Sequence, residues 1–192
     1  MRKIRIIVHV SLDGVFQPAA TPGEGGDDYA NGGWTVPYRT PDGRQAVLEA
    51  HGSSFDLLLG RLTYELFAGF WPKAGNIPIA NAINAATKYV ATHRPGSLGW
   101  GPARGLGPDV VTGVREMRSK DGPDLVVLGS ASLASVLLAE GLVDEVLLLV
   151  YPVLLGRGRR FFPEGAETRK LALVGTKTTS SGVLMNTYRP VA

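Results

Sequence analysis

The amino-acid sequence predicts an α/β domain with a mixed central sheet of about eight strands. Short apolar runs rich in Val, Ile and Leu alternate with segments of helical spacing, which is typical of a buried sheet flanked by helices. In the last third, apolar runs are joined by a short polar connection, which indicates antiparallel strands. With 192 residues, 44% of them hydrophobic and 19% charged, the chain fits one ordinary globular domain over residues 1–192.

Four strands and four helices are expected in the first two thirds of the chain. The strands are residues 4–10, 55–59, 89–92 and 125–128. The helices are residues 43–51 after a Thr40-Pro41 start signal, 61–70, 112–120, and 132–140 before a stop at Gly141. We expect their inward apolar faces to be Leu62, Leu66, Phe67 and Phe70, then Val114 and Met117, then Leu133, Val136 and Leu137. Helices between successive strands imply parallel β-α-β crossovers.

Three further strands are expected at residues 143–151, 170–174 and 183–188. The Lys/Thr/Ser/Gly segment between the last two is typical of a tight antiparallel connection, so the sheet is expected to be mixed. Residues 143–151 are strongly apolar, and an apolar edge strand of this kind predicts a homodimer. Residues 18–43 are rich in Gly, Pro and Asp and include Trp34 and Tyr38, which favours a functional lid over a disordered loop.

The composition excludes several classes of protein. The chain has no cysteine, so it can have no disulfide framework, no thiolate metal site and no cysteine nucleophile, and a cytoplasmic location is expected. The apolar stretch at residues 6–10 is too short for a signal peptide or a membrane span, so no membrane association is expected. The histidines His9, His51 and His93 lie on separate expected elements with no carboxylate at ligand spacing, which argues against a metal site.

The charge pattern gives little support to nucleic-acid binding. The net charge of +3 comes from 20 basic and 17 acidic residues, and most of the basic residues are dispersed. Binding to nucleic acid needs them on one face. The densest cluster, Arg157, Arg159 and Arg160, is interpreted as the solvated flank of a turn. No nucleic-acid partner is therefore expected.

The segment Leu59-Gly60-Arg61-Leu62-Thr63 passes from a strand into a helix at a glycine. There the first free backbone N–H groups and the positive end of the helix dipole face outward, which suits an anion. Arg61 can add a charged fork for phosphate and a flat face for adenine, and Thr63 can donate a hydroxyl. An alternative stays open, in which Thr63 caps the helix and Arg61 is a solvated surface arginine.

Two more strand ends offer groups for a nucleotide. The Gly129-Ser130-Ala131 junction has small residues that let a pyrophosphate approach the backbone, although it could equally be a plain N-cap. Neither this junction nor the one at Gly60 follows the G-x-G-x-x-G pattern of dinucleotide-binding proteins. Thr92-His93-Arg94 offers a hydroxyl, an imidazole and a guanidinium for an extra ribose phosphate, or forms an exposed basic loop.

Three acidic positions are candidate functional carboxylates. Asp13 follows the first strand, where it is either a turn residue or a carboxylate that lines the site. Asp27 and Asp28 lie in the Gly-rich loop and are interpreted as solvated charges. Glu65 lies on a helix and is interpreted as a surface ion-pair partner.

Four ordered motifs resemble the dihydrofolate reductase superfamily, and within it the C-terminal reductase domain of bacterial bifunctional riboflavin-biosynthesis deaminase-reductases and their stand-alone relatives. The motifs are Ser11-Leu12-Asp13-Gly14, Gly60-Arg61-x-Thr63-Tyr64-Glu65, Gly129-Ser130 with Leu133, and Gly141-Leu142-Val143-Asp144-Glu145 followed by Pro152-Val153-Leu154-Leu155-Gly156-x-Gly158. The resemblance covers nearly the whole chain. It implies a dihydrofolate reductase-like three-layer fold, in which helices flank the mixed sheet.

The resemblance also implies which residues bind NADPH. The Gly-Arg-x-Thr segment of the family binds the adenosine and phosphate part of the cofactor, and the second glycine turn cradles the pyrophosphate. The loop after the third strand usually meets the 2′-phosphate. By this resemblance the cofactor-binding residues are Gly14, Gly60, Arg61, Thr63, Thr92, His93, Arg94, Gly129, Ser130 and Ala131. Ser130 departs from the second glycine that relatives commonly have.

We therefore expect an NADPH-dependent reductase that transfers hydride to a small heteroaromatic, pyrimidine- or pteridine-like substrate. It would resemble 5-amino-6-(5-phosphoribosylamino)uracil reductase of riboflavin biosynthesis. Asp13 is expected to orient or protonate the substrate, and Trp34 or Trp71 to hold its ring. The folate-protonating carboxylate of true dihydrofolate reductases has no counterpart after Val15. A non-catalytic nucleotide- or flavin-binding protein on the same fold is the alternative.

Overall fold

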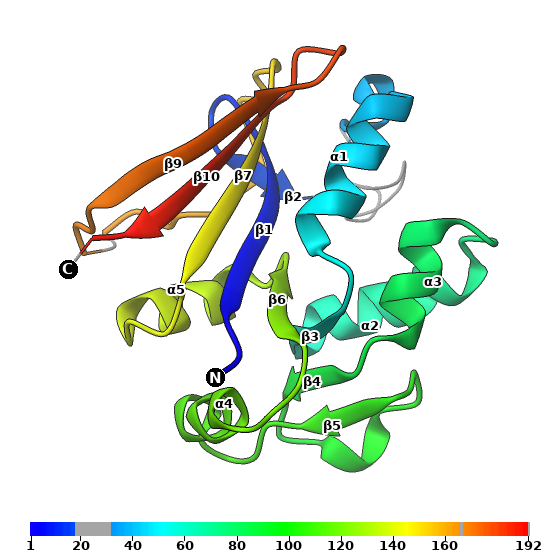
Figure 1. Ribbon diagram of the computed structural model, residues 1–192, viewed down its shortest axis with the longest axis vertical. Coiled ribbons are helices and arrows are strands. Elements are labelled where there is room, and N and C mark those ends of the chain that lie inside the picture. The colour runs from blue at the N-terminus through cyan, green and yellow to red at the C-terminus, as the bar shows by residue number, and fades with distance from the viewer. Residues whose placement is uncertain (18–31, 166, 192) are drawn as a thin grey trace. The chain divides into compact units, whose positions relative to one another are not determined.

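The computed structural model describes residues 1–17, 32–165 and 167–191, which form an α/β structure (Figure 1). In chain order the elements are β1 (Ile4–Ser11), β2 (Val15–Gln17), η1 (Val36–Tyr38), α1 (Pro41–His51), β3 (Phe55–Gly60), α2 (Arg61–Phe70), η2 (Trp71–Lys73), α3 (Pro78–Ala85), β4 (Lys88–Ala91), η3 (Pro95–Ser97), β5 (Ala103–Gly105), α4 (Val110–Ser119), β6 (Asp124–Leu128), α5 (Ala131–Ala139), β7 (Glu145–Tyr151), β8 (Arg159–Arg160), β9 (Leu171–Thr178) and β10 (Leu184–Pro190).

The main sheet has eight strands in the order β5-β4-β3-β6-β1-β7-β10-β9, and β2 pairs with β8 in a separate ribbon. It contains parallel and antiparallel pairs, so the predicted mixed sheet of about eight strands is confirmed. The chain forms two compact units. The first unit consists of Met1–Ile6 and Leu48–Asp144, and the second of Ile7–Val47 and Glu145–Ala192.

The first unit is built on the parallel strands β5, β4, β3 and β6. The middle of β3, residues 57–59, is fully buried, because parallel strands covered on both faces are apolar along their length. Parallel pairing places the carboxyl ends of these strands at one edge of the sheet. The loops that carry Gly60, Thr92 and Gly129 leave the sheet at that edge.

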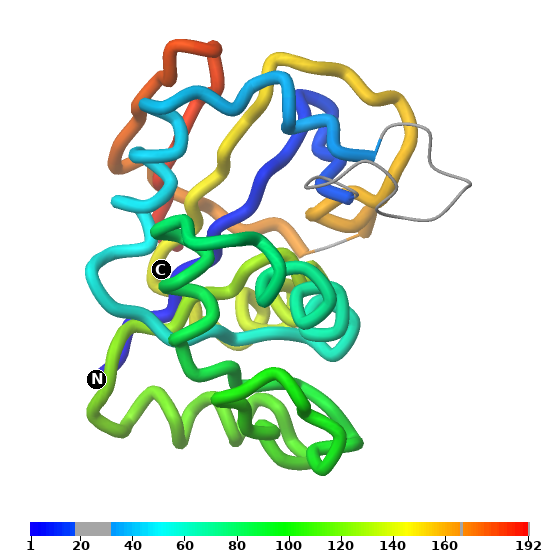
Figure 2. The backbone as a smooth tube through the Cα atoms, turned by 90° about the vertical axis from the view of Figure 1, so that its right-hand side faces the viewer, coloured from blue at the N-terminus to red at the C-terminus, as the bar shows by residue number. Residues whose placement is uncertain are grey.

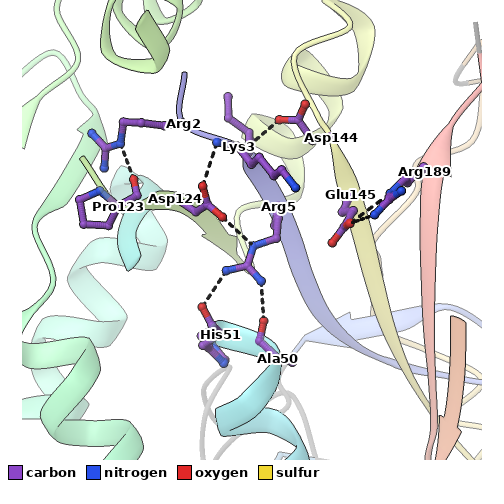
Figure 3. Close-up of polar contacts among 11 residues, drawn as sticks. Arg2, Lys3, Arg5, Ala50, His51, Pro123, Asp124, Asp144, Glu145 and Arg189 are labelled. Carbon is purple, nitrogen blue, oxygen red and sulfur yellow. Dashed lines mark hydrogen bonds and ion pairs between the residues drawn. The ribbon is translucent and has the colours of Figure 1, made fainter. Parts of the chain in front are cut away.

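The first residues of the chain are tied into the first unit by polar contacts (Figure 3). The backbone N–H of Lys3 donates to Asp124 Oδ1 at 3.0 Å. The guanidinium of Arg5 donates to the carbonyls of Ala50 at 2.8 Å and His51 at 2.7 Å. These bonds fix the amino end of β1 beside β6 and the end of α1.

The second unit contains the antiparallel strands β7, β10 and β9, and the β9–β10 hairpin is drawn in orange and red in Figures 1 and 2. The expectation that residues 143–151 form an edge strand is wrong, because β7 lies between β1 and β10. The edge strand here is β9, and its residues 172–178 are all exposed.

Two predicted apolar faces differ from the structure. In α2 the buried residues are Thr63 and Tyr64, whereas three residues of the predicted inward face are exposed: Leu62 (57%), Leu66 (40%) and Phe70 (37%). Tyr64 is drawn inward because its hydroxyl finds backbone partners there, which a count of apolar residues does not reveal. In α5, Val136 is 42% exposed.

Other expectations are confirmed. α2 has the predicted bounds, Val114 and Met117 are buried in α4, and Gly141 ends α5 with a left-handed φ of 63°. Residues 18–31, which contain Asp27 and Asp28 and most of the expected lid, lie outside the described residues. In the parts of the chain that the structure describes, every helix is too short or too polar to span a bilayer.

Candidate functional site

Two bends that are far apart in the sequence meet in the first unit. One joins β3 to α2 at Gly60, and the other joins β6 to α5 at Gly129 and Ser130. The backbone N–H of Gly60 donates to Ser130 Oγ at 2.9 Å. A Cβ added to Gly129 would lie 3.4 Å from Thr63 Cγ2. The two glycine bends therefore form one continuous site at the carboxyl ends of adjacent strands.

The second bend has an unusual backbone. Gly129 has a φ of 59° and Ser130 a φ of 47°, so two successive residues are left-handed. Ser130 is the only non-glycine residue with positive φ in the described parts of the chain. A side chain in this conformation costs about 1–2 kcal/mol, and such strain clusters at functional sites. The Ser130 hydroxyl offsets part of the cost by accepting the Gly60 N–H.

Gly60, in contrast, is not required by the backbone. Its φ of −72° and ψ of 156° are extended values that any residue adopts. A Cβ there would meet Ser130 Oγ at 3.5 Å, which is an ordinary contact. A Cβ would therefore fit beside Ser130, and its absence leaves room for a ligand to approach the Gly60 backbone.

The helix N-termini at both bends lack side-chain caps. Neither Gly60 before α2 nor Ser130 before α5 makes a side-chain capping hydrogen bond to its helix. Thr63 is buried and provides no cap either, so the interpretation of Thr63 as the helix cap is wrong. Uncapped first-turn N–H groups and two helix dipoles make this site suitable for an anionic group.

Arg61 lies at the start of α2 and is held by three acceptors. Its Nε is 2.6 Å from Glu65 Oε1, and its Nη1 donates to Ser97 Oγ at 2.8 Å and to the Arg94 carbonyl at 3.3 Å. The interpretation of Arg61 as a solvated surface arginine is therefore wrong, whereas Glu65 is the expected ion-pair partner. The guanidinium is oriented in advance beside the bends.

Arg94 approaches the same carboxylate from the loop after β4. Its Nη2 is 3.8 Å from Glu65 Oε1, and its side chain is 71% exposed. Its backbone N–H donates to Thr92 Oγ1 at 3.0 Å, which shapes the turn that also contains the exposed His93. Two guanidinium groups thus share one carboxylate near the helix N-terminus.

A hollow of about 510 Å³ opens next to Arg61 and is lined by Glu65, Ser97 and Trp100. This volume is within the range of small-molecule sites. Tyr64 fixes its wall, because its hydroxyl accepts the Trp100 N–H at 2.7 Å and donates to the Trp100 carbonyl at 3.1 Å.

Asp13 belongs to the second unit, where it is anchored in a polar turn. It accepts hydrogen bonds from Ser11 Oγ at 2.6 Å and from the backbone N–H groups of Leu155 at 3.1 Å and Gly156 at 2.8 Å. The Ser11 hydroxyl, followed by these amides, lowers the pKa of Asp13 to about 2. A carboxylate held in this way is ionised at neutral pH and is a poor proton donor. Its use in orienting substrate stays a prediction, as does a cofactor contact at the adjacent Gly14, whose φ is 81°.

The two candidate ring-binding tryptophans belong to different units. Trp34, in the second unit, is 7% exposed and packs its ring against Tyr151. Trp71 is in η2 of the first unit, where Phe67 and Phe70 contact it edge to face.

Sequence reasoning missed one polar pair, His9 and Tyr151. His9 Nδ1 is 2.7 Å from the Tyr151 hydroxyl. The two residues are 142 positions apart, and no spacing or motif in the sequence links them.

The comparisons with known proteins agree with this architecture. Residues 107–185 match the model of the RibD C-terminal domain family. The uncharacterized protein YyaP of Bacillus subtilis is 28% identical over 136 residues, which are 69% of this chain and 72% of that protein. A structure from Shewanella sp. PV-4 that is named for riboflavin biosynthesis has a TM-score of 0.71 at 19% identity and covers 99% of each chain. A pyrimidine reductase-like protein from Corynebacterium diphtheriae has a TM-score of 0.64 at 12% identity, over 100% of this chain and 92% of that one.

The sheet order and the paired glycine bends define a protein with the dihydrofolate reductase-like fold. Within that fold, residues 107–185 are similar to the RibD C-terminal domain family. The resemblance predicted from the sequence is thus confirmed.

Proposed function

We propose that this protein is an NADPH-dependent reductase of the RibD C-terminal type. Its substrate would be a small heteroaromatic, pyrimidine- or pteridine-like compound that carries a reducible carbonyl or imine. The observation that carries this proposal is the meeting of the Gly60 and Gly129 bends, joined by the bond from Gly60 N–H to Ser130 Oγ.

The residues of the first unit fit the diphosphate of such a cofactor. The open space at Gly60 admits a phosphate to the backbone, and the uncapped N-termini of α2 and α5 supply N–H donors. The left-handed turn at Gly129 and Ser130 would present its backbone amides to the same phosphates. Gly129, Ser130 and Ala131 would therefore hold the pyrophosphate together with Gly60 and Thr63.

The cationic residues fit the 2′-phosphate that distinguishes NADPH from NADH. Arg61 and Arg94 are already gathered around Glu65, and a phosphate could replace this carboxylate as their shared acceptor. The hollow next to Arg61 would then receive the adenosine. Thr92 and His93 flank this position on the loop after β4.

The bound nicotinamide would supply hydride, and the protein supplies binding and geometry. The bends orient the dinucleotide across the ends of the strands, where ligands of open α/β sheets bind. The ionised Asp13 would accept a hydrogen bond and orient a group of the substrate or cofactor.

The experiment that tests this proposal is a thermal-shift assay with NADPH, NADH, FMN and FAD in parallel. A ligand that binds only the native state raises the melting temperature by mass action. We expect NADPH to give the largest shift, followed by a smaller shift with NADH. A shift with the flavins alone would contradict the proposal.

A second assay separates a reductase from a non-catalytic nucleotide-binding protein. NADPH oxidation would be followed by absorbance in the presence of pterins, pyrimidines and quinones. Turnover of one class supports the reductase. Saturable NADPH binding with no oxidation across the panel would favour the binding protein instead. The expected homodimer is a separate prediction, which sedimentation equilibrium tests.

A further inference from the structure

Aromatic side chains surround the hydroxyl-bearing Tyr151 at the end of β7, within the second unit. Tyr151 is 6% exposed, and the ring of Trp34 stands edge-on to it at 5.1 Å between centroids. Tyr38 contacts the same ring at 5.5 Å, again edge to face. His9 on β1 places Nδ1 2.7 Å from the Tyr151 hydroxyl. His9 and Tyr38 are half-buried, so the cluster lies at the boundary of the core.

Trp34 brings an unsatisfied donor to this cluster. Its Nε1–H is buried and has no hydrogen-bond partner, although the residue is 7% exposed. An orphaned buried donor is destabilising, because the N–H has lost its hydrogen bonds to water without gaining another acceptor. Trp71 Nε1–H is also buried without a partner, whereas Trp100 Nε1–H donates to Asn84 Oδ1 at 3.0 Å. The indole of Trp34 is thus ready to donate to an acceptor that comes from outside the chain.

Tyr151 is a proton-bearing group at neutral pH. Burial raises its pKa to about 12, and the positive charge of Arg39 opposes that rise. A phenol has one proton, so the hydroxyl can donate outward only when His9 Nδ1–H donates to the phenol oxygen. The imidazole therefore determines whether the Tyr151 proton is available to a ligand.

We propose that Tyr151 is the proton donor of the reductase and that Trp34 binds the heteroaromatic substrate through its Nε1–H. His9 is the positioning residue that directs the Tyr151 proton toward the substrate. This inference rests on the proposed reductase function and identifies its substrate site. It selects Trp34 over Trp71 because Trp34 packs against the hydroxyl-bearing Tyr151, whereas Trp71 packs against two phenylalanines. It gives proton donation to Tyr151 because Asp13 is held ionised.

The proton and electron balance of the step is simple. Hydride from a reduced nicotinamide forms a C–H bond at the carbon of a C=O or C=N group, and the π electron pair moves to the oxygen or nitrogen. That atom takes the proton of Tyr151, because an alcohol or amine product is a weaker acid than a phenol. The phenolate is stabilised by the hydrogen bond that His9 Nδ1–H donates to it, and it regains its proton from water after the product leaves.

The first test uses the unmodified protein. Tryptophan labelled with ¹⁵N in the indole gives one N–H resonance each for Trp34, Trp71 and Trp100, which tryptophan-to-phenylalanine variants assign. Pterin, lumazine and uracil are added separately at millimolar concentration. We expect at least one probe to move the Trp34 resonance downfield and to leave the Trp71 and Trp100 resonances in place. No shift at Trp34 with any probe, or a shift at Trp71 instead, would overturn the inference.

The second test uses variants and the affinity of the responding probe. Tyr151→Phe keeps the ring and removes the hydroxyl, so we expect affinity to fall about 2- to 10-fold, the equivalent of one hydrogen bond. His9→Asn retains an N–H donor and should keep wild-type affinity, whereas His9→Leu should match Tyr151→Phe. Tyr188→Phe, on β10 of the same unit, is the control. Equal affinities for His9→Asn and His9→Leu would refute the positioning role.

The outcome for the cofactor is read separately. NADPH thermal shifts are measured on the wild-type protein and on Tyr151→Phe. If NADPH binds both proteins but Tyr151→Phe leaves the affinity for the probes unchanged, this inference fails and the reductase proposal stands. If NADPH does not bind the wild-type protein, the reductase proposal fails. Once a substrate is found, Tyr151→Phe should lower kcat by about 10²–10⁴-fold, the range of general acid catalysis, with a smaller change in KM.

Discussion

Ser130 connects the two glycine bends, and its replacement separates backbone strain from ligand access. Ser130→Gly removes the left-handed strain, worth about 1 kcal/mol. It also removes the acceptor of the Gly60 N–H, a bond of 2.9 Å that contributes about 1 kcal/mol. The two effects nearly cancel, so the stability of Ser130→Gly should stay within about 0.5 kcal/mol of wild type.

Ser130→Ala is the matched control because it loses the same hydroxyl and keeps the strained Cβ. We expect it to be less stable than Ser130→Gly by about 1 kcal/mol, which corresponds to roughly 2–4 °C in Tm for a chain of this size. Thermal denaturation followed by circular dichroism measures this difference. A glycine variant less stable than the alanine variant would refute the strain argument.

The same pair tests access of the cofactor to Gly60. In the wild-type protein a phosphate oxygen must replace Ser130 Oγ as the acceptor of the Gly60 N–H. Ser130→Gly removes this competitor, so NADPH should bind about 2- to 10-fold more tightly to the variant. Isothermal titration calorimetry would measure the change. Weaker binding would mean that the Ser130 hydroxyl itself contacts the cofactor.

Three further predictions follow from individual contacts. Glu65→Gln removes the negative charge shared by Arg61 and Arg94, so NADPH affinity should rise about 3- to 10-fold at low salt while NADH affinity hardly changes. The control is Glu140→Gln, which breaks the separate surface pair with Arg115. Equal effects of the two changes on NADPH affinity would contradict the assignment. Asp13→Asn should lower the free energy of unfolding by about 1 kcal/mol at neutral pH. Because the folded pKa of Asp13, about 2, is below the ordinary 3.8, its stabilisation is present above pH 3.8 and lost as pH falls through 2. The Tm difference from wild type should therefore shrink in acid, and a constant difference would exclude the ionised carboxylate. Tyr64→Phe leaves the N–H and carbonyl of the buried Trp100 without their partner and should cost about 1–3 kcal/mol in urea unfolding, whereas Tyr188→Phe should cost less than about 0.5 kcal/mol.

The strands and the bends could be predicted because local chemistry determines them. β3 and β6 are short apolar runs that end at a glycine, and that pattern shows where each chain segment leaves the sheet. Parallel strands bring such ends to the same edge, but β4 and β5 lie between β3 and β6 in the sequence, so the approach of Gly60 to Gly129 was predicted with the help of the family resemblance.

Other features depend on contacts that are distant in the sequence. The apolar stripe of α2 suggested that Leu62 and Leu66 face inward, but the hydroxyl of Tyr64 is satisfied by the backbone of Trp100, and this selects the other face. β5 (Ala103–Gly105) was missed because its three residues include Arg104 and a glycine and show no apolar pattern.

In the candidate site, too, some features follow from the local sequence and others depend on contacts distant in the sequence. Arg61 was recognisable from its position at a helix start, but the role of Glu65 as an ionic partner shared with Arg94 required the fold of the loop after β4. Asp13 accepts one hydrogen bond from Ser11 within the Ser-Leu-Asp-Gly motif, but its other two partners are backbone amides more than 140 residues away, which the motif does not reveal.

The central claim is that the bends at Gly60 and Gly129 bind one diphosphate through their amides. A titration of ¹⁵N-labelled protein with NADPH, followed by amide resonances, tests it most directly. The account predicts that the largest shifts occur at Gly60, Arg61 and residues 129–131. Shifts confined to other parts of the chain, with these amides unmoved at saturation, would contradict it.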